Sequence, residues 1–316
     1  MANPMISRLT ALPSGLRVFA LRRFSPSILT STFAPNSQHL AGRRHHGTES
    51  SSPNAASSSV NQTEVSHFNT LASEWWDPHG SSRLLHLMNP LRHDFIRQCL
   101  RQDASHDPSK KIRYMDIGCG GGIFAESAAR LSNTASVTGI DPTPQVFAVA
   151  KRHQRTDPYL LEKNPETGEP RLKYLNTSIE GLVDHPKETN FDIISLFEVI
   201  EHIQRPSPFL QACLQHLKPG GWLIGSTMAR TNTSWFTTKF VAEEVLKMVP
   251  RGTHDWNQYI QPEELRSWAR TQPDLAASSG TGWHVMGVVY VPGLGWREIN
   301  GSETWGNYFF AMQKRI

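Results

Sequence analysis

The feature that most constrains this chain is a glycine-rich turn directly after a short, mostly apolar stretch. The stretch is Ile112–Ile117, with Asp116 near its end, and the turn is Gly118–Gly122. An apolar helical pattern follows over 123–131. A strand, a glycine turn and a helix in this order are typical of the first unit of a nucleotide-binding α/β fold. Glycine adopts positive φ there and lets a ligand approach the bare backbone at the carboxyl end of the strand.

The details of the turn discriminate between ligands. A dinucleotide fingerprint has glycine at its first, third and sixth positions, whereas this turn has Gly118, Gly120 and then Ile123. No Lys-Ser/Thr pair follows, as a phosphate-binding P-loop requires. A second predicted strand, 136–140, ends in Asp141, whose carboxylate can accept both hydroxyls of a ribose. The turn and Asp141 indicate an adenosine-type ligand, and no phosphate-binding motif is evident. This combination favours S-adenosylmethionine over NAD. The alternative is a glycine turn beside a surface Asp.

The rest of the chain alternates between predicted strands and helices. Further strands are expected at 171–175, 191–196 and 222–227, helices at 144–154 and 208–217, and a turn at 218–221. Before the first strand we expect one helix over 65–76 and another after Asn89-Pro90, and 157–170 is expected to be a polar surface insertion. The runs 284–291 and 307–313 should close the chain with an antiparallel strand. Such alternation implies a mostly parallel sheet with helices on both faces.

The basic residues are concentrated in the N-terminal tail. Residues 1–48 contain six arginines, no lysine and no acidic residue, although the whole chain carries a net charge of only +4. Without these six, the chain has 26 basic and 28 acidic side chains, a net charge of −2, so no nucleic-acid partner is expected. An Arg-rich, Ser-rich, acid-free tail is typical of a mitochondrial transit peptide. The alternative is a disordered arm. We expect a linker over 49–60 and the folded domain over 61–316.

A cluster of acidic and histidine residues follows the strand predicted at 191–196. Glu198, Glu201 and His202 have spacings of three and four, which would place them on one face if Glu198 began a helical turn. The carboxyl end of a parallel sheet is where ligands bind. Two carboxylates and one imidazole suit Mg²⁺, Mn²⁺ or Zn²⁺. The alternative is a solvated helix cap.

Several stretches together resemble one protein family. Residues 116–122 are similar to motif I of class I methyltransferases. The W-W-D, N-P-L-R, E-x-x-E-H, K-P-G-G and P-x-G-T-H-D stretches at 72–77, 89–92, 198–202, 217–221 and 249–255 resemble the ubiquinone-biosynthesis O-methyltransferases. The resemblance runs from about residue 65 to 313. It implies a Rossmann-like class I methyltransferase fold, with a seven-stranded, mostly parallel sheet, a C-terminal antiparallel strand and helices on both faces.

The resemblance also implies a site and a reaction. The positions that match donor contacts in the family are Arg92, Gly118, Asp141 and Phe197. Glu198, Glu201 and His202 match its holders of a divalent ion, usually magnesium; Glu201 and His202 are the expected catalytic residues, with His202 as general base if no metal binds. The implied reaction transfers a methyl group from S-adenosylmethionine to 3,4-dihydroxy-5-polyprenylbenzoate and to demethylubiquinol. One departure is Ala229, where bacterial members usually have Asn.

Such an acceptor is very apolar, yet no run of 18 apolar residues is present to span a membrane. Within the expected insertion 232–255, residues 234–250 have an apolar and a polar helical side, with Phe236 and Phe240 on the polar side. These aromatics could enter a membrane interface or line a substrate channel, or the helix could simply pack on the sheet. We expect peripheral contact with the matrix side of the inner membrane and other ubiquinone-biosynthesis proteins as partners. Rival functions are an NAD-dependent oxidoreductase and a non-catalytic assembly subunit on a methyltransferase scaffold.

Overall fold

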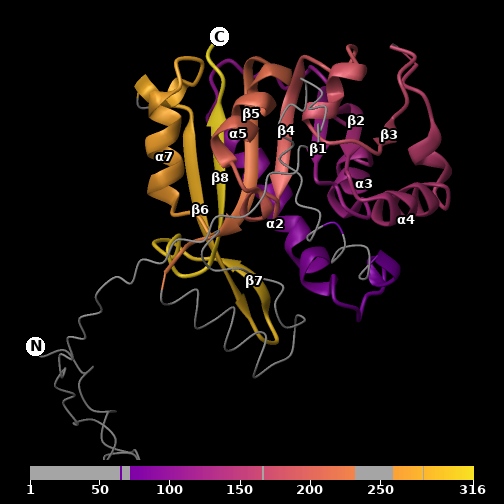
Figure 1. Cartoon of the computed structure of the whole chain (residues 1–316), viewed down its shortest axis with the longest axis horizontal. Coiled ribbons are helices and arrows are strands. Elements are labelled where there is room, and N and C mark those ends of the chain that lie inside the picture. The colour runs from indigo at the N-terminus through magenta and orange to yellow at the C-terminus, as the bar shows by residue number, and fades with distance from the viewer. Residues whose placement is uncertain (1–64, 66–71, 166, 232–258, 280) are drawn as a thin grey trace, which may run out of the picture. The chain divides into compact units, whose positions relative to one another are not determined.

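The computed structural model describes residues 65, 72–165, 167–231, 259–279 and 281–316 (Figure 1). The chain divides into two compact units, 1–52 and 53–316, and all described residues belong to the second. The predicted transit peptide, the linker and the amphipathic insertion 232–255 lie outside the described residues. Within the described ranges, no helix is both long and apolar enough to cross a membrane.

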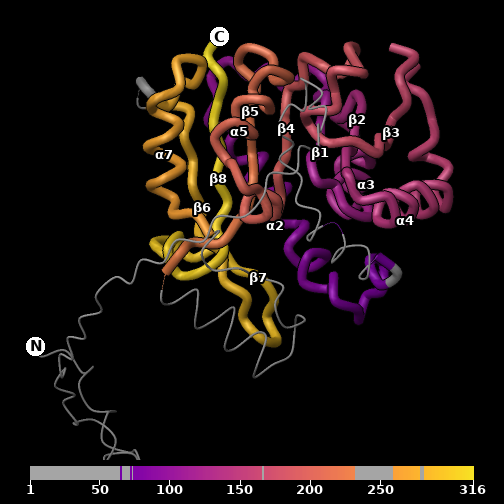
Figure 2. The backbone as a smooth tube through the Cα atoms, in the orientation of Figure 1, coloured from indigo at the N-terminus to yellow at the C-terminus, as the bar shows by residue number. Residues whose placement is uncertain are grey.

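The described strands form one mixed sheet, which can also be followed along the backbone tube in Figure 2. The strands are β1 (Ile112–Ile117), β2 (Thr134–Ile140), β3 (Leu172–Leu175), β4 (Phe191–Phe197), β5 (Leu217–Met228), β6 (Trp283–Val291), β7 (Gly295–Glu298) and β8 (Asn307–Gln313). Their order is β3-β2-β1-β4-β5-β8-β6-β7. The pairs among the first five are parallel, whereas β5 with β8, β8 with β6, and β6 with β7 are antiparallel. The predicted class I fold with its closing antiparallel strand is confirmed.

The sheet has one strand more than the seven that the resemblance implies. The additional strand is β7, which pairs with β6 through a hairpin turn at 292–294. Gly293 and Gly295 both have positive φ in this turn, near 80°, and the Leu294 N–H donates to the Val291 carbonyl at 2.9 Å. Four residues are too few to show strand periodicity in a sequence, so this pairing was not predicted.

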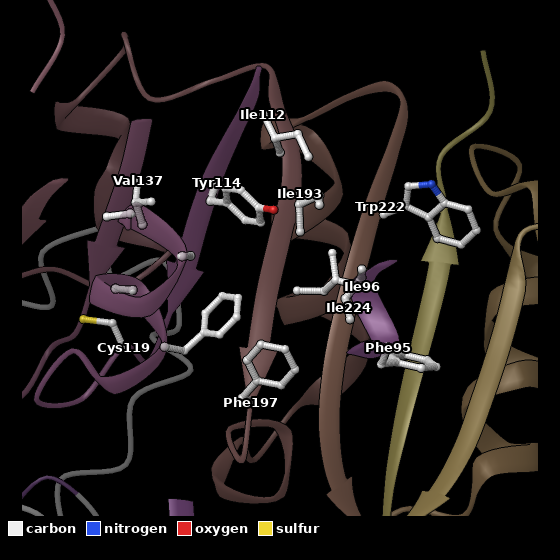
Figure 3. Packing of buried hydrophobic residues seen from close by; sticks show 14 of the residues in the cluster. Phe95, Ile96, Ile112, Tyr114, Cys119, Val137, Ile193, Phe197, Trp222 and Ile224 are labelled. Carbon is white, nitrogen blue, oxygen red and sulfur yellow. The ribbon is translucent and has the colours of Figure 1, made fainter. Parts of the chain in front are cut away.

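Helices cover both faces of the sheet. They are α2 (Arg83–Gln102), α3 (Ile123–Ala129), α4 (Pro144–Gln154), α5 (Pro206–His216) and α7 (Pro262–Thr271). Helices α2, α3 and α4 contribute to one hydrophobic cluster, and α5 and α7 to another. Successive strand residues alternate between the two: Tyr114 belongs to the first and Met115 to the second. Figure 3 shows part of the first cluster, with Phe95 and Ile96 of α2 on the same side of the sheet as Tyr114.

Three local predictions can be compared with the structure. Helix α2 begins at Arg83 and contains Pro90, whereas we expected it to begin after Asn89-Pro90. Met88 and Phe95 are both buried, so packing on either side of the proline offsets the hydrogen bond that its missing N–H removes. Of the region predicted as a helix over 65–76, residues 66–71 lie outside the described residues; Val65 is helical, and Ala72–Glu74 form a 3-10 turn, η1, in place of an α-helix. The turn predicted at 218–221 is instead an irregularity within β5.

That irregularity is held by the end of the chain. Between Phe191 and Ile193 of β4, the partner residue on β5 moves from Leu217 to Trp222. The Gly220 N–H donates to the Lys314 carbonyl at 3.1 Å, and the Lys314 N–H donates to the Gly221 carbonyl at 2.9 Å. The glycines therefore form a bulge that β5 accommodates because the C-terminal residues supply hydrogen-bond partners.

Candidate functional site

The glycine-rich turn leaves the carboxyl end of β1 and leads directly into α3. Gly118, Gly120 and Gly122 have φ of 64°, 55° and 93°, a region that side chains with a Cβ rarely adopt. The end of β2 holds the turn. The Gly120 N–H donates to Asp141 Oδ2 at 3.0 Å, and the Cys119 N–H donates to the Ile140 carbonyl at 3.0 Å. Bare backbone is thus fixed where the fold binds ligands.

Gly118 also brings the turn against the segment that follows β4. A Cβ added at Gly118 would lie 2.6 Å from Cγ2 of Val199, far inside van der Waals contact. Val199 stands between Glu198 and the 3-10 turn η4 (Ile200–His202). The two regions singled out from the sequence, about 80 residues apart in the chain, are therefore packed against each other at the carboxyl ends of β1 and β4.

Asp141 lies at the end of β2, as predicted, and is buried. Its Oδ1 accepts the Thr143 N–H at 2.8 Å, while its Oδ2 accepts the Gly120 N–H. Burial raises its pKa, and the hydrogen bonds from Thr143 and Gly120 oppose that rise. A carboxylate offers about four acceptor positions, so Asp141 can hold the turn and still accept the hydroxyls of a ribose.

Arg92 and Phe197 come together from α2 and β4. The Arg92 guanidinium lies 4.8 Å from the centroid of the Phe197 ring and is buried. Its Nε–H has no hydrogen-bond partner among the described residues. Burial lowers the pKa of Arg92, and the charges of Glu198 and Asp116 act in the opposite direction. A buried, stacked guanidinium with a donor to spare fits a carboxylate group, such as that of an amino-acid ligand.

Asp116 is a site residue to which sequence reasoning gave no role of its own. It is buried at the end of β1, where the Ser195 hydroxyl donates to its Oδ1 at 2.6 Å. Burial raises its pKa to about 7, while Ser195 and Arg92 oppose the rise. The signal available in the sequence was an acidic residue two positions before the first glycine, in an otherwise apolar strand.

The expected helical face of Glu198, Glu201 and His202 is wrong. Strand β4 ends at Phe197, and Glu198 has φ of 58°, in the left-handed region, so it begins no helical turn. Instead it stays attached to β5: its N–H donates to the Ser226 carbonyl at 3.1 Å, and its Oε1 accepts the Ser226 hydroxyl at 2.6 Å. These bonds offset a strain of about 1 kcal/mol for a residue with a Cβ.

Glu201 and His202 lie in η4, and Glu201 is buried. Its Oε2 accepts the Thr227 hydroxyl of β5 at 2.9 Å. Burial and the negative charge of Glu198 raise the pKa of Glu201 to about 7, and His202 opposes that rise. The three side chains therefore influence one another. The hydroxyls of Ser226 and Thr227, which helical spacing does not predict, orient the two carboxylates.

These side chains do not fit a divalent ion as they are arranged. In the part of the chain that the structure describes, no three His, Cys, Asp or Glu side chains converge as metal ligands do. The Glu198 carboxylate faces Ser226, with Asn307 Nδ2 at 3.5 Å from its other oxygen.

Ala229, the departure from the bacterial pattern, is buried in the second hydrophobic cluster, and its N–H donates to the Gly306 carbonyl at 2.9 Å.

Known proteins that are similar to this chain are methyltransferases. A family described as a methyltransferase domain matches residues 84–272. The ubiquinone biosynthesis O-methyltransferase of Candida albicans, named as mitochondrial, is 37% identical over 293 residues, covering 81% of this chain and 86% of the relative. The Schizosaccharomyces pombe protein of the same name is 40% identical over 261 residues, covering 81% and 87%.

A solved structure supports the fold. The plantazolicin methyltransferase BpumL, in complex with an analog and SAH, aligns with a TM-score of 0.51 at 14% identity, over 80% of this chain and 97% of its own. The fold, the glycine turn and the acidic residue after β2 define a class I S-adenosylmethionine-dependent methyltransferase. Within that class, the chain belongs to the ubiquinone-biosynthesis O-methyltransferase family. Both of these relatives are mitochondrial by name, in agreement with the expected mitochondrial location.

Gly118 should be required for donor binding. In Gly118→Ala, the left-handed backbone strains the alanine, and its Cβ clashes with Val199. We therefore expect the Kd for S-adenosylhomocysteine to rise at least about tenfold. Gly168→Ala is the matched control, because Gly168 has φ of 70° but no atom within 4 Å of an added Cβ. Isothermal titration calorimetry measures both. Equal Kd values for the two variants would contradict the prediction.

Asp116 should give stability a specific pH dependence. Its pKa is about 7 in the folded chain and about 3.9 when unfolded. The folded state therefore binds the extra proton, and the stabilising contribution is lost as pH rises between these values. The free energy of unfolding of the wild type minus that of Asp116→Asn should therefore fall as pH rises, by at most about 1.4 kcal/mol per pH unit. Urea unfolding across this range tests it, and a constant difference would exclude it. Glu201 titrates in both proteins, so its effect cancels.

Proposed function

We propose that this enzyme methylates a hydroxyl of 3,4-dihydroxy-5-polyprenylbenzoate and of demethylubiquinol, using S-adenosylmethionine as donor. The observation that carries the proposal is the contact between the two halves of the site. The glycine turn that faces a donor packs at Gly118 on Val199, next to the acidic residues that can face an acceptor. The curated relatives named for ubiquinone biosynthesis support the choice of acceptor.

The donor would be held at its two ends. Arg92 would bind the carboxylate of the methionine part with the guanidinium that stacks on Phe197. Asp141 would accept the ribose hydroxyls, and the Gly118 backbone would lie beside the sulfonium arm. The buried Asp116 carboxylate and the half-buried Glu198 carboxylate add negative potential near the positively charged sulfur and amino groups of the donor.

The acceptor hydroxyl needs to lose a proton. A phenol has a pKa of about 10 and is a weak nucleophile at neutral pH. We assign His202 as the general base: its ring accepts the hydroxyl proton while the oxygen attacks the methyl carbon, and the carbon–sulfur bond electrons return to sulfur. The nearby Glu201 carboxylate, held by Thr227, stabilises the imidazolium that forms. Alignment of the two reactants can contribute about 7–11 kcal/mol.

A divalent ion, as the family resemblance implies, would have to be held by Glu198, Glu201 and His202. Their present arrangement does not form that ligand set, so these side chains would first have to rearrange. When bound to a catechol, such an ion stabilises the phenolate. Turnover measured with a chelator, and again after magnesium is added back, decides between a metal-binding role and a general-base role. Turnover that is lost with the chelator and recovered with magnesium assigns the three residues to an ion. Turnover that is unchanged by the chelator supports His202 as the base.

Glu201 should be needed for turnover but not for donor binding. Glu201→Gln keeps an oxygen for the Thr227 hydroxyl and removes the charge, so kcat should fall at least about 100-fold. The Kd for S-adenosylhomocysteine should stay within about twofold. Glu188→Gln is the control, because Glu188 is also buried and accepts a threonine hydroxyl, from Thr138 at 3.0 Å, away from the site. Loss of donor binding in Glu201→Gln would make the residue structural.

The proposed location is the matrix side of the mitochondrial inner membrane, in contact with other ubiquinone-biosynthesis proteins. It is supported by the Arg-rich tail and by the apolar acceptor. The segment 234–250, which lies outside the described residues, is the proposed membrane contact. Replacing Phe236 and Phe240 with Ser should reduce co-flotation with anionic vesicles, because two aromatic anchors are lost. Unchanged co-flotation would exclude these residues as anchors.

Two rival functions make different predictions. An NAD-dependent oxidoreductase would bind NAD, which Ile123 at the sixth position of the turn disfavours. A non-catalytic assembly subunit would bind the donor without transferring methyl groups, although Glu201 and His202 are present. The decisive experiment is labelled-methyl transfer to a polyprenyl dihydroxybenzoate, and the absence of labelled product from a protein that binds the donor would overturn the proposed function.

A further inference from the structure

Two adjacent tryptophans lie on the glycine turn. A Cβ added at Gly120 would lie 2.2 Å from Cζ2 of Trp75, and one added at Gly121 would lie 2.2 Å from its Cδ1. The Trp75 indole is therefore in direct contact with the backbone of both glycines, and it is buried there with Ile123, Val146 and other apolar residues of a third cluster. In the sequence, the W-W-D stretch is only a mark of family resemblance.

Trp76 binds the same turn through a hydrogen bond. Its Nε1–H donates to the Gly121 carbonyl at 2.8 Å. Its ring stacks on the His153 ring, with centroids 3.5 Å apart and planes 3° from parallel. His153 Nδ1 in turn lies 2.9 Å from the fully buried Glu126 carboxylate. Trp76 therefore connects the turn to residues of both α3 and α4.

The tryptophan pair is also anchored to α2. The His86 imidazole donates from Nε2 to the Trp75 carbonyl at 3.0 Å. The turn also contacts Tyr174 and Asp141. A Cβ added at Gly122 would lie 2.1 Å from the Tyr174 hydroxyl, and Asp141 accepts the Gly120 N–H. The turn is thus confined by side chains from several elements, and the tryptophans contact the two glycines in its centre.

Such confinement matters because glycine has the largest conformational freedom of any residue. A turn with several glycines that was free to move would have to be ordered by its ligand, and the ordering would weaken binding. Contacts that fix the turn beforehand remove that penalty. Contacts of this kind change the affinity for the ligand that binds at the turn. They do not change the affinity for an acceptor that binds elsewhere.

We propose that Trp75 and Trp76 are positioning residues of the donor site, which set the affinity for S-adenosylmethionine by holding Gly120 and Gly121 in their binding conformation. They act through the backbone of the turn and touch none of the reacting atoms. The W-W-D stretch is then part of the donor site, although it lies about 40 residues before the turn in the sequence.

The first experiment removes one hydrogen bond. Trp76→Phe keeps an aromatic ring for His153 and loses the bond to the Gly121 carbonyl, so the Kd for S-adenosylhomocysteine and the KM for the donor should rise about fivefold. The KM for the acceptor should not change. The matched control is Trp268→Phe, which loses an indole hydrogen bond of the same length, 2.8 Å, to the Ser207 hydroxyl. Equal donor affinities in the two variants, or a parallel rise in both KM values for Trp76→Phe, would overturn the proposal.

The second experiment tests the Trp75 contact directly. The φ of Gly121 is not positive, so alanine is allowed by the backbone there, and the atoms nearest to the new methyl group all belong to Trp75. Gly121→Ala should displace the indole and weaken donor binding at least about threefold. Combined with Trp75→Leu, which frees that space, the two changes should raise the Kd by less than the product of their separate effects. Fully multiplicative effects, with each variant folded by circular dichroism, would show that Trp75 does not act through the turn.

Discussion

The site depends on the close approach of bare backbone to its neighbours between residues 118 and 122. Val199 contacts Gly118, Trp75 contacts Gly120 and Gly121, and Tyr174 contacts Gly122, each at a distance that leaves no room for a Cβ. These contacts join β1 to the ends of β3 and β4 and to the segment before α2. The glycine turn is therefore a packing junction as well as a ligand-binding loop, and its shape is fixed by side chains from distant parts of the chain.

Charge balance is the second constraint on this end of the sheet. Asp116, Asp141 and Glu201 are buried, and burial raises the pKa of each. Hydroxyl groups and backbone N–H groups satisfy these carboxylates, and the buried Arg92 is a cation near Asp116. Such an environment favours a ligand that brings both a positive charge and a carboxylate. S-adenosylmethionine has a sulfonium, an amino group and a carboxylate, and so it complements both signs.

The fold class was predictable because a parallel sheet leaves a strong periodic signal. Runs such as 191–196 are apolar on both faces, and they alternate with helical patterns, so the strands and their parallel pairing followed. The failures were local. The helix through Pro90 and the bulge at 218–221 depend on packing partners far along the chain, and Glu198 adopts a left-handed backbone that its E-x-x-E-H context does not signal. Helical spacing does not apply there, because no helix begins at that residue.

The sequence by itself determined the class of fold, the donor and the residues at the carboxyl ends of the strands, because these depend on local pattern: glycines where positive φ is required, and an acidic residue after the second strand. The tertiary structure alone decided how the site is assembled. It placed Arg92 against Phe197, bound Glu198 to Ser226 and Glu201 to Thr227, and laid Trp75 on the glycine turn. Each of these contacts joins residues that are distant in the chain, and packing between elements leaves no periodic signal within any one of them.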